Sequence, residues 1–167
     1  MKAYLDNNVV SSIVRDDNPS QSQALSALLE AFDARKVELV TSEITLEVIK
    51  KCPLEHRAPL ERTFRLLEKI PVTPGQVLVG INSYGDGRSW INSPVIRNDP
   101  LFDSLLGLGL EVIDARHIFA AAKEGCTVFL TCDNSPRTGI LRRDKAIHQC
   151  CGVQVQRPSE FVSDQGW

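Results

Sequence analysis

The sequence lacks any long run of apolar residues. A transmembrane helix needs about 20 consecutive apolar residues, and no such stretch occurs in the chain. The amino terminus, MKAYLDNN, turns polar within its first eight positions and does not read as a secretory signal. We therefore expect a cytoplasmic protein without a membrane segment.

Paired cysteines are also lacking. The five cysteines form an odd set without a Cys-x-x-Cys spacing, which argues against a disulfide framework and against a zinc site. Because no basic partner for a catalytic thiol is identifiable, we expect reduced thiols without a part in chemistry. They are Cys52, Cys126, Cys132, Cys150 and Cys151.

The chain has no excess of positive charge. Its formal net charge is −2 at pH 7, although binding to nucleic-acid phosphates favours Lys and Arg. Basic residues nevertheless cluster at Arg35–Lys36, at Lys50–Lys51, and from Arg137 to Lys145. Each cluster alone is better explained as a solvated helix end than as a nucleic-acid contact.

Length and composition indicate an ordinary globular domain. The chain has 167 residues, of which 43% are hydrophobic and 24% are charged. A chain of this length buries about two thirds of its unfolded surface. We expect one domain over residues 1–167, with a Gly- and Pro-rich loop or insertion around 82–100.

Strand and helix patterns alternate. Short apolar runs predict strands at KAYL, VELV, TVFLT and VQV, with VLVGI as a further candidate. Four helices are predicted. One follows a cap at Asn18, one follows a cap at Thr41–Ser42, one lies over 60–70, and one runs from Asp114 as N-cap to a stop at Gly125. Alternation of this kind predicts an α/β fold: a three-layer α/β/α sandwich with a mainly parallel central sheet.

Four acidic residues fall where predicted strands end or helices begin: Asp6, Glu47, Asp114 and Asp133. In such sheets ligands bind outside the carboxyl ends of the strands, so the four can meet there. Two unit charges about 4 Å apart repel by about 4 kcal/mol at an effective dielectric near 20. A cation would relieve this repulsion, and hard oxygen ligands without His or Cys favour Mg²⁺ or Mn²⁺.

Each acid also has a structural explanation. Asp114 is sufficiently explained as a helix N-cap, and Asp6 and Asp133 are ordinary turn residues after strands. Glu47 lies among apolar neighbours, although an exposed helix face would also accommodate it. Their joint placement favours the metal site over four separate explanations.

Three segments resemble motifs of the PIN-domain nucleases, and among these the VapC-like toxins. YLDNNVV is similar to the family's opening Asp with a polar residue two positions later, and TSEITLEVIKK to its Ser/Thr-rich turn before a helix Glu. IDARHIFAAAKEGCTVFLTCD resembles its Asp-led helix, strand and Thr-x-Asp. The matching positions are Asp6, Asn8, Glu47, Asp114, Thr131 and Asp133.

The resemblance implies a PIN-like domain with metal-dependent endoribonuclease activity on RNA, and a toxin role with an antitoxin or a second copy as partner. Asp6, Glu47, Asp114 and Asp133 would be catalytic and hold one or two Mg²⁺ or Mn²⁺ ions. Asn8 and Thr131 would orient them. The candidates for phosphate contacts are Arg137, Arg142 and Arg143, while His117 is better explained as a packed or surface residue.

The sequence departs from the family in two places. Asn134-Ser135-Pro136 stands where many relatives carry an acid and an aromatic residue, and Ser83–Arg97 is longer than in compact toxins. Two other functions stay open. One is an inactive PIN-like scaffold that binds RNA or protein, against which the four acids argue. The other is a phosphoryl-transfer domain using Asp6, which lacks the second Asp of a D-x-D motif.

Overall fold

The central element of the protein is a parallel sheet of five strands in the order β3-β2-β1-β4-β5. The structure, a computed structural model, describes residues 1–9, 19–42, 45, 70–73, 99–133, 135 and 139–167. The strands are β1 (Lys2–Leu5), β2 (Glu38–Ser42), β3 (Val72–Thr73), β4 (Val128–Leu130) and β5 (Gln154–Gln156).

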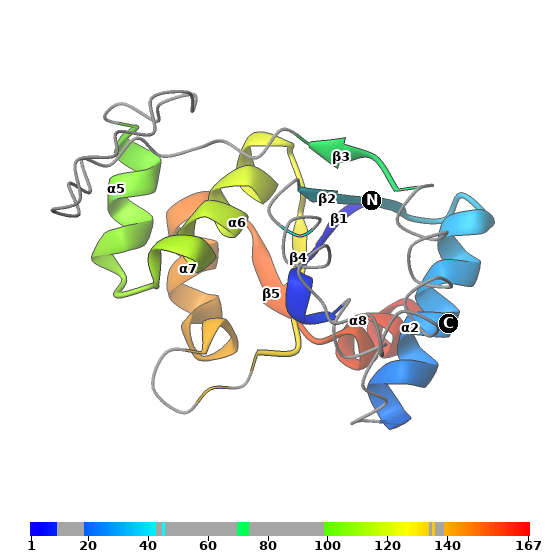
Figure 1. Cartoon of the computed structure of the whole chain (residues 1–167). Coiled ribbons are helices and arrows are strands. Elements are labelled where there is room, and N and C mark those ends of the chain that lie inside the picture. Colours follow the sequence, from blue (N-terminus) through cyan, green and yellow to red (C-terminus); the bar gives the residue numbers. More distant parts are fainter. Residues whose placement is uncertain (10–18, 43–44, 46–69, 74–98, 134, 136–138) are drawn as a thin grey trace, which may run out of the picture.

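Helices cover both faces of this sheet (Figure 1). On one side lie α2 (Pro19–Asp33) and α8 (Pro158–Gln165). On the other lie α5 (Pro100–Gly107), α6 (Val112–Lys123) and α7 (Asp144–Cys151). The predicted three-layer α/β/α sandwich with a parallel sheet is therefore confirmed. No helix in the described ranges has both the length and the apolar character needed to cross a bilayer.

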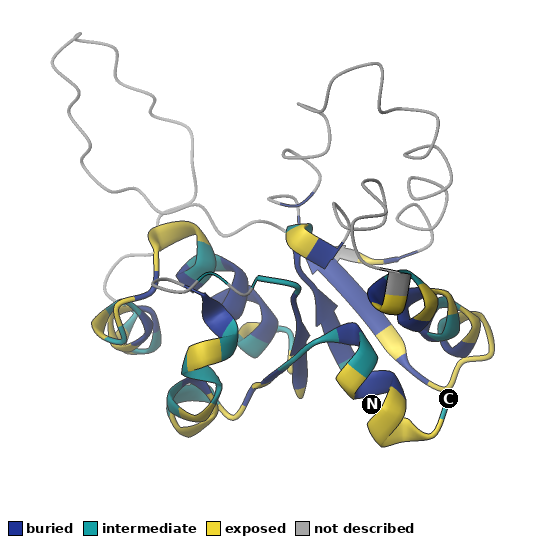
Figure 2. Cartoon of the chain, turned by 90° about the horizontal axis from the view of Figure 1, so that it is seen from below, coloured by how far each residue is buried: buried dark blue, intermediate teal, exposed yellow. Residues whose placement is uncertain are grey.

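Side chains of the strands alternate between two hydrophobic cores, as the pleat of a strand requires. Ala3 and Leu5 pack with α2 and α8, whereas Tyr4 packs with α5, α6 and α7. The strands are accordingly buried along most of their length, and exposed residues lie on the outer helix faces (Figure 2). Burial on both faces explains why the strands read as short continuous apolar runs.

The carboxyl ends of β1 and β4 leave the sheet side by side. Leu5 pairs with Leu130, and the Asp6 amide donates a 3.0 Å hydrogen bond to the Leu130 carbonyl. The Thr131 amide in turn donates to the Gln156 carbonyl at 3.0 Å. The residues that follow these strands are therefore held at one edge of the sheet.

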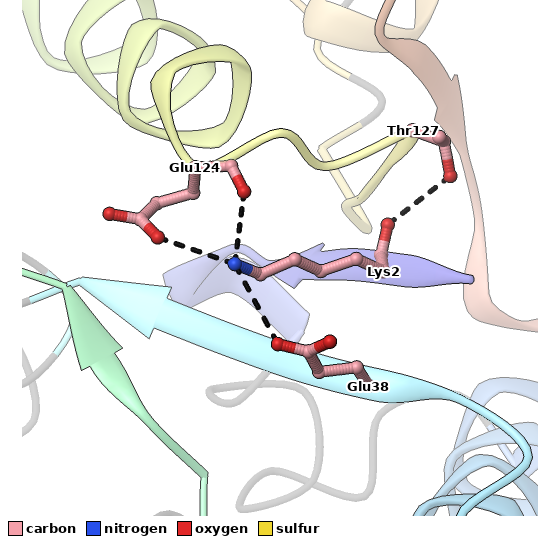
Figure 3. A network of polar contacts seen from close by, with 4 residues as sticks. All are labelled: Lys2, Glu38, Glu124 and Thr127. Carbon is pink, nitrogen blue, oxygen red and sulfur yellow. Dashed lines mark hydrogen bonds and ion pairs between the residues drawn. The ribbon is translucent and has the colours of Figure 1, made fainter.

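The opposite, amino-terminal edge carries a different polar network (Figure 3). Lys2 Nζ lies 2.9 Å from the Glu124 carbonyl, 3.3 Å from Glu124 Oε2 and 3.7 Å from Glu38 Oε1. Thr127 Oγ1 donates to the Lys2 carbonyl at 3.2 Å. These contacts join β1, β2 and the end of α6, and they use charges that no site at the carboxyl edge employs.

One predicted helix start is wrong. Asp114 is not the N-cap of α6, because the extended residue before the helix is Glu111 (φ −64°, ψ 151°) and the Ala115 amide bonds to the Glu111 carbonyl at 2.9 Å. Asp114 lies inside the first turn, where a carboxylate also favours the positive end of the helix. The predicted stop is confirmed, since α6 ends at Lys123 and Gly125 follows with φ +69°.

Several elements were not predicted from the sequence: β3, α5, α7 and α8. The last three are only eight residues each, which leaves little room for a periodic pattern. Other predictions fall outside the described residues. These are the helix after Ser42 apart from Thr45, the helix of 60–69, the VLVGI strand, and the loop of 82–98.

Candidate functional site

Asp6 lies at the carboxyl edge, directly after β1, and is only 1% exposed. Thr131 Oγ1, which follows β4, donates a 2.7 Å hydrogen bond to Asp6 Oδ2. Asn8 Nδ2 donates to the same oxygen at 3.2 Å. The two side chains predicted to orient the acids thus contact the buried carboxylate.

Burial makes ionisation of Asp6 unfavourable. The pKa of Asp6 is raised to about 6, against an ordinary value of 3.8, and desolvation is the largest cause. Hydrogen bonds from Thr131, from the Asn7 backbone and from Asn8 work in the opposite direction, and the charge of Asp133 raises the pKa further. A positive charge near this carboxylate would therefore be stabilising.

Asp114 faces the same region from the first turn of α6. The pKa of Asp114 is raised to about 7, first by desolvation and then by the charges of Asp6, Asp133 and Glu111. The charge of Arg143 lowers it. The charges of Asp6 and Asp133 therefore act on Asp114, and the charge of Asp133 acts on Asp6.

Asp133 also acts as a turn residue after a strand, the structural explanation that the sequence offered for it. Its Oδ1 accepts a 3.0 Å hydrogen bond from the Ser135 amide, and its Oδ2 accepts one at 3.3 Å from the Ile140 amide. Ile140 begins the 3₁₀ turn η2 (Ile140–Arg143) that leads into α7. Asp133 thus organises the loop after β4 in addition to facing the other acids.

The donor atoms suit a hard divalent cation. Asp6, Asp114 and Asp133 offer carboxylate oxygens, and the pKa values of the first two are raised by burial and by neighbouring negative charge. Across the described ranges, no three His, Cys, Asp or Glu side chains are grouped closely enough to hold an ion. Glu47, the fourth predicted ligand, lies outside these ranges.

The predicted arginines differ in their surroundings. Arg143 Nε donates to the Leu108 carbonyl at 3.0 Å and an Arg143 terminal nitrogen to the Gly139 carbonyl at 3.4 Å. Its guanidinium is therefore anchored to the backbone while its charge acts on Asp114. Arg142 is exposed, and Arg137 lies outside the described residues.

His117 is a packed residue, as the sequence favoured. It is 1% exposed, and its Nδ1 lies 2.8 Å from the hydroxyl of Tyr4. Desolvation, followed by the charge of Arg116, lowers the pKa of His117 to about 4, so the ring is neutral at pH 7. Tyr4 was missed from the sequence, although a single phenol in an otherwise apolar strand signals a buried hydroxyl that needs a partner.

Burial keeps the Cys126 thiol protonated. Cys126 is 5% exposed, and burial raises the pKa of its thiol to about 12. A thiol of this kind stays protonated and packs as a small apolar group. No disulfide joins the cysteines of the described part, Cys126, Cys132, Cys150 and Cys151. Cys52 lies outside it.

Comparison with known proteins supports the fold. No protein-family model and no curated protein sequence matches the chain. Among solved structures, the chain is similar to one in the crystal structure of VapBC2 from Rickettsia felis bound to a DNA fragment from their promoter. The TM-score is 0.50 and the identity 11%, over 94% of this chain and 98% of that chain. This protein therefore shares its α/β/α fold with a chain of a VapBC complex.

Proposed function

We propose that this protein is a PIN-like, Mg²⁺- or Mn²⁺-dependent endoribonuclease that hydrolyses RNA phosphodiester bonds. The observation that carries the proposal is electrostatic: the charges of Asp6 and Asp133, which follow β1 and β4, raise the pKa of Asp114 in the first turn of α6. Carboxylates that disfavour one another's ionisation are expected where a cation completes the site.

Asp6, Asp114 and Asp133, with Glu47, would hold the ion. The chemistry that a bound divalent ion supplies is polarisation of a phosphoryl oxygen and activation of water, so no protein nucleophile is required. Thr131 and Asn8 keep Asp6 Oδ2 in place through hydrogen bonds of 2.7 and 3.2 Å. The charge of the anchored Arg143, beside Asp114, would attract the phosphate backbone.

We further infer that the protein acts as the toxin of a toxin–antitoxin pair. The fold likeness to a chain of the VapBC2 complex supports an antitoxin protein as partner. A second copy of the chain is a further partner expected from the sequence. At 11% identity this likeness concerns the fold, so the toxin role rests on the sequence motifs around Asp6, Asp114 and Asp133.

A second candidate is a PIN-like scaffold that binds RNA or protein without cleaving it. The observation in its favour is that both carboxylate oxygens of Asp133 accept backbone hydrogen bonds, which gives this residue a structural reason to be acidic. The burial of Asp6 favours the nuclease instead. A carboxylate that served only in a turn would be more stable in water than at 1% exposure, where desolvation disfavours its charge.

The test is cleavage of single-stranded RNA by the purified chain, measured with Mn²⁺ and with EDTA. A parallel assay with p-nitrophenyl phosphate as substrate measures phosphatase activity. We expect internal RNA cleavage with Mn²⁺ that EDTA abolishes, and no phosphatase activity. Asp114→Asn should remove cleavage, whereas Asp103→Asn, an exposed acid on α5, should not. RNA binding without cleavage at saturating Mn²⁺ would establish the scaffold in place of the nuclease.

A further inference from the structure

A cluster of four polar residues is buried between β1, β2 and α6. Tyr4, Ser42 and Thr45 are each 0% exposed, and His117 is 1% exposed. The Tyr4 ring stacks on Phe129 with centroids 5.2 Å apart and an interplanar angle of 8°. This stacking fixes the direction of the Tyr4 hydroxyl, which lies 2.8 Å from His117 Nδ1.

Packing alone does not explain this cluster. Ser42 Oγ, Thr45 Oγ1 and His117 Nε2 are buried without a hydrogen-bond partner among the residues that the structure describes. The Ser42 and Thr45 hydroxyls lie near enough to Tyr4 to lower its pKa, against the larger raising effect of burial, yet neither makes a hydrogen bond of good geometry. Since unsatisfied buried polar atoms destabilise a fold, Phe and Leu would fill this space at less cost.

Tyr4 and His117, which share this hydrogen bond, lie within three residues of two of the acids along the chain. Tyr4 lies on β1, and Asp6 directly follows this strand, with its amide still bonded to the Leu130 carbonyl of β4. Residues two positions apart in an extended chain lie on the same face. His117 follows Asp114 by three residues on α6, so the two are neighbours on one face of the helix. The bond thus links the strand that presents one acid to the helix that presents the other.

We propose that Tyr4 and His117 are positioning residues whose hydrogen bond sets the placement of Asp114 relative to Asp6. The inference rests on the proposed metal site. The 2.8 Å hydrogen bond between the Tyr4 hydroxyl and Nδ1 of the neutral His117 ring keeps the first turn of α6 in register with the end of β1. Without this bond the two carboxylates would no longer be held ready for a shared ion, which weakens ion binding more than it weakens RNA binding.

Two variants remove the bond and one preserves it. Tyr4→Phe deletes the hydroxyl and retains the stacked ring, and His117→Leu deletes the ring nitrogen that the hydroxyl contacts. His117→Asn retains polar atoms at the δ position that can form a hydrogen bond with the Tyr4 hydroxyl. Leu28→Ala, in α2 on the opposite face of the sheet, is the control for a general loss of stability.

The measurements are the Mn²⁺ dissociation constant by titration calorimetry, kcat and KM for RNA, and the melting temperature. We expect Tyr4→Phe and His117→Leu to weaken Mn²⁺ binding by about 10-fold or more, the usual effect of losing a group that orients metal ligands. The double variant should be no worse than either single variant, because both remove one bond. kcat should fall with little change in KM, and His117→Asn should recover most of the Mn²⁺ affinity.

The alternatives separate cleanly. If Tyr4→Phe lowers the melting temperature as Leu28→Ala does but leaves Mn²⁺ affinity and kcat unchanged, the bond is structural and the positioning role is refuted. Tyr4→Phe decides this even where His117→Leu does not fold, because it removes a single oxygen atom. If the unaltered protein neither binds Mn²⁺ nor cleaves RNA, the proposed function fails first, and the positioning role fails with it.

Discussion

The hydroxyl of Thr131 joins the ends of two adjacent strands by donating a 2.7 Å hydrogen bond to Asp6 Oδ2. Thr131 Oγ1 itself accepts a 3.0 Å hydrogen bond from the Asp133 amide. One small side chain therefore orients one candidate ligand and fixes the backbone of another. The Thr-x-Asp spacing has a physical reason, because the Thr hydroxyl contacts the amide two residues ahead and the acid that follows the neighbouring strand.

Thr131→Val should disrupt this unit while keeping the shape of the side chain. The buried Asp6 carboxylate would lose its shortest hydrogen bond, so the pKa of Asp6 should rise further and the free energy of unfolding should fall by about 1.5–3 kcal/mol at pH 7. RNA cleavage should fall as well. Thr131→Ser, which retains the hydroxyl, is the control for chemical denaturation and for cleavage. Equal stability of the Val and Ser variants would show that the hydroxyl contributes nothing.

The metal-free protein should become less stable as the pH rises from about 4 to about 7. The folded pKa values of Asp6 (about 6) and Asp114 (about 7) lie above the ordinary 3.8, so the folded state holds more protons over this interval and loses them as the pH rises. His117 acts in the opposite direction, because its folded pKa of about 4 lies below 6.5. Two acids outweigh one histidine.

Denaturation midpoints measured across this pH interval, with and without Mn²⁺, test the prediction. Asp114→Asn should flatten the decline, most clearly above about pH 6, where Asp114 is the last of the three groups to titrate. Mn²⁺ should raise stability at pH 7 by binding the folded state. A decline of the same size in Asp114→Asn would mean that another group is responsible.

Asp133→Asn should abolish RNA cleavage and leave the fold intact. The substitution removes one of three mutually repelling charges, but Asn keeps only one of the two acceptor oxygens that bind the Ser135 and Ile140 amides. The two effects oppose each other, so the change in unfolding free energy should stay within about 1 kcal/mol. Circular dichroism and thermal unfolding check the fold. Collapse of the variant would mark Asp133 as a purely structural residue.

Glu47 and Glu43 can be separated by matched substitutions. Both lie outside the described residues, and the prediction comes from the sequence, where Glu43 directly follows a Ser42 cap and Glu47 lies a turn further among apolar neighbours. Glu47→Gln should reduce RNA cleavage by orders of magnitude. Glu43→Gln should cost at most about 1 kcal/mol of stability, because the helix dipole explains its charge. Rates at saturating Mn²⁺ decide, and the reverse pattern would contradict the assignment.

The sequence by itself determined the layers and the position of the candidate site. β1 and β4 are short apolar runs buried on both faces, and each is followed by an acid, so a parallel sheet brings Asp6 and Asp133 to one edge. This much follows from patterns only a few residues long. The start of α6 did not follow, since local signals at Asp114 and Glu111 are both compatible with a helix beginning.

Only the tertiary structure decided what the side chains meet. Tyr4 and His117 are 113 residues apart in sequence, and Thr131 and Asp6 are 125 apart. Burial and the charges of residues on other elements raise the pKa values of Asp6 and Asp114. Burial also keeps the His117 ring neutral beside the Tyr4 hydroxyl. Residue patterns along the chain specify which face of an element is buried. The electric field and the hydrogen-bond partners at a site depend on distances that exist only after the elements have packed.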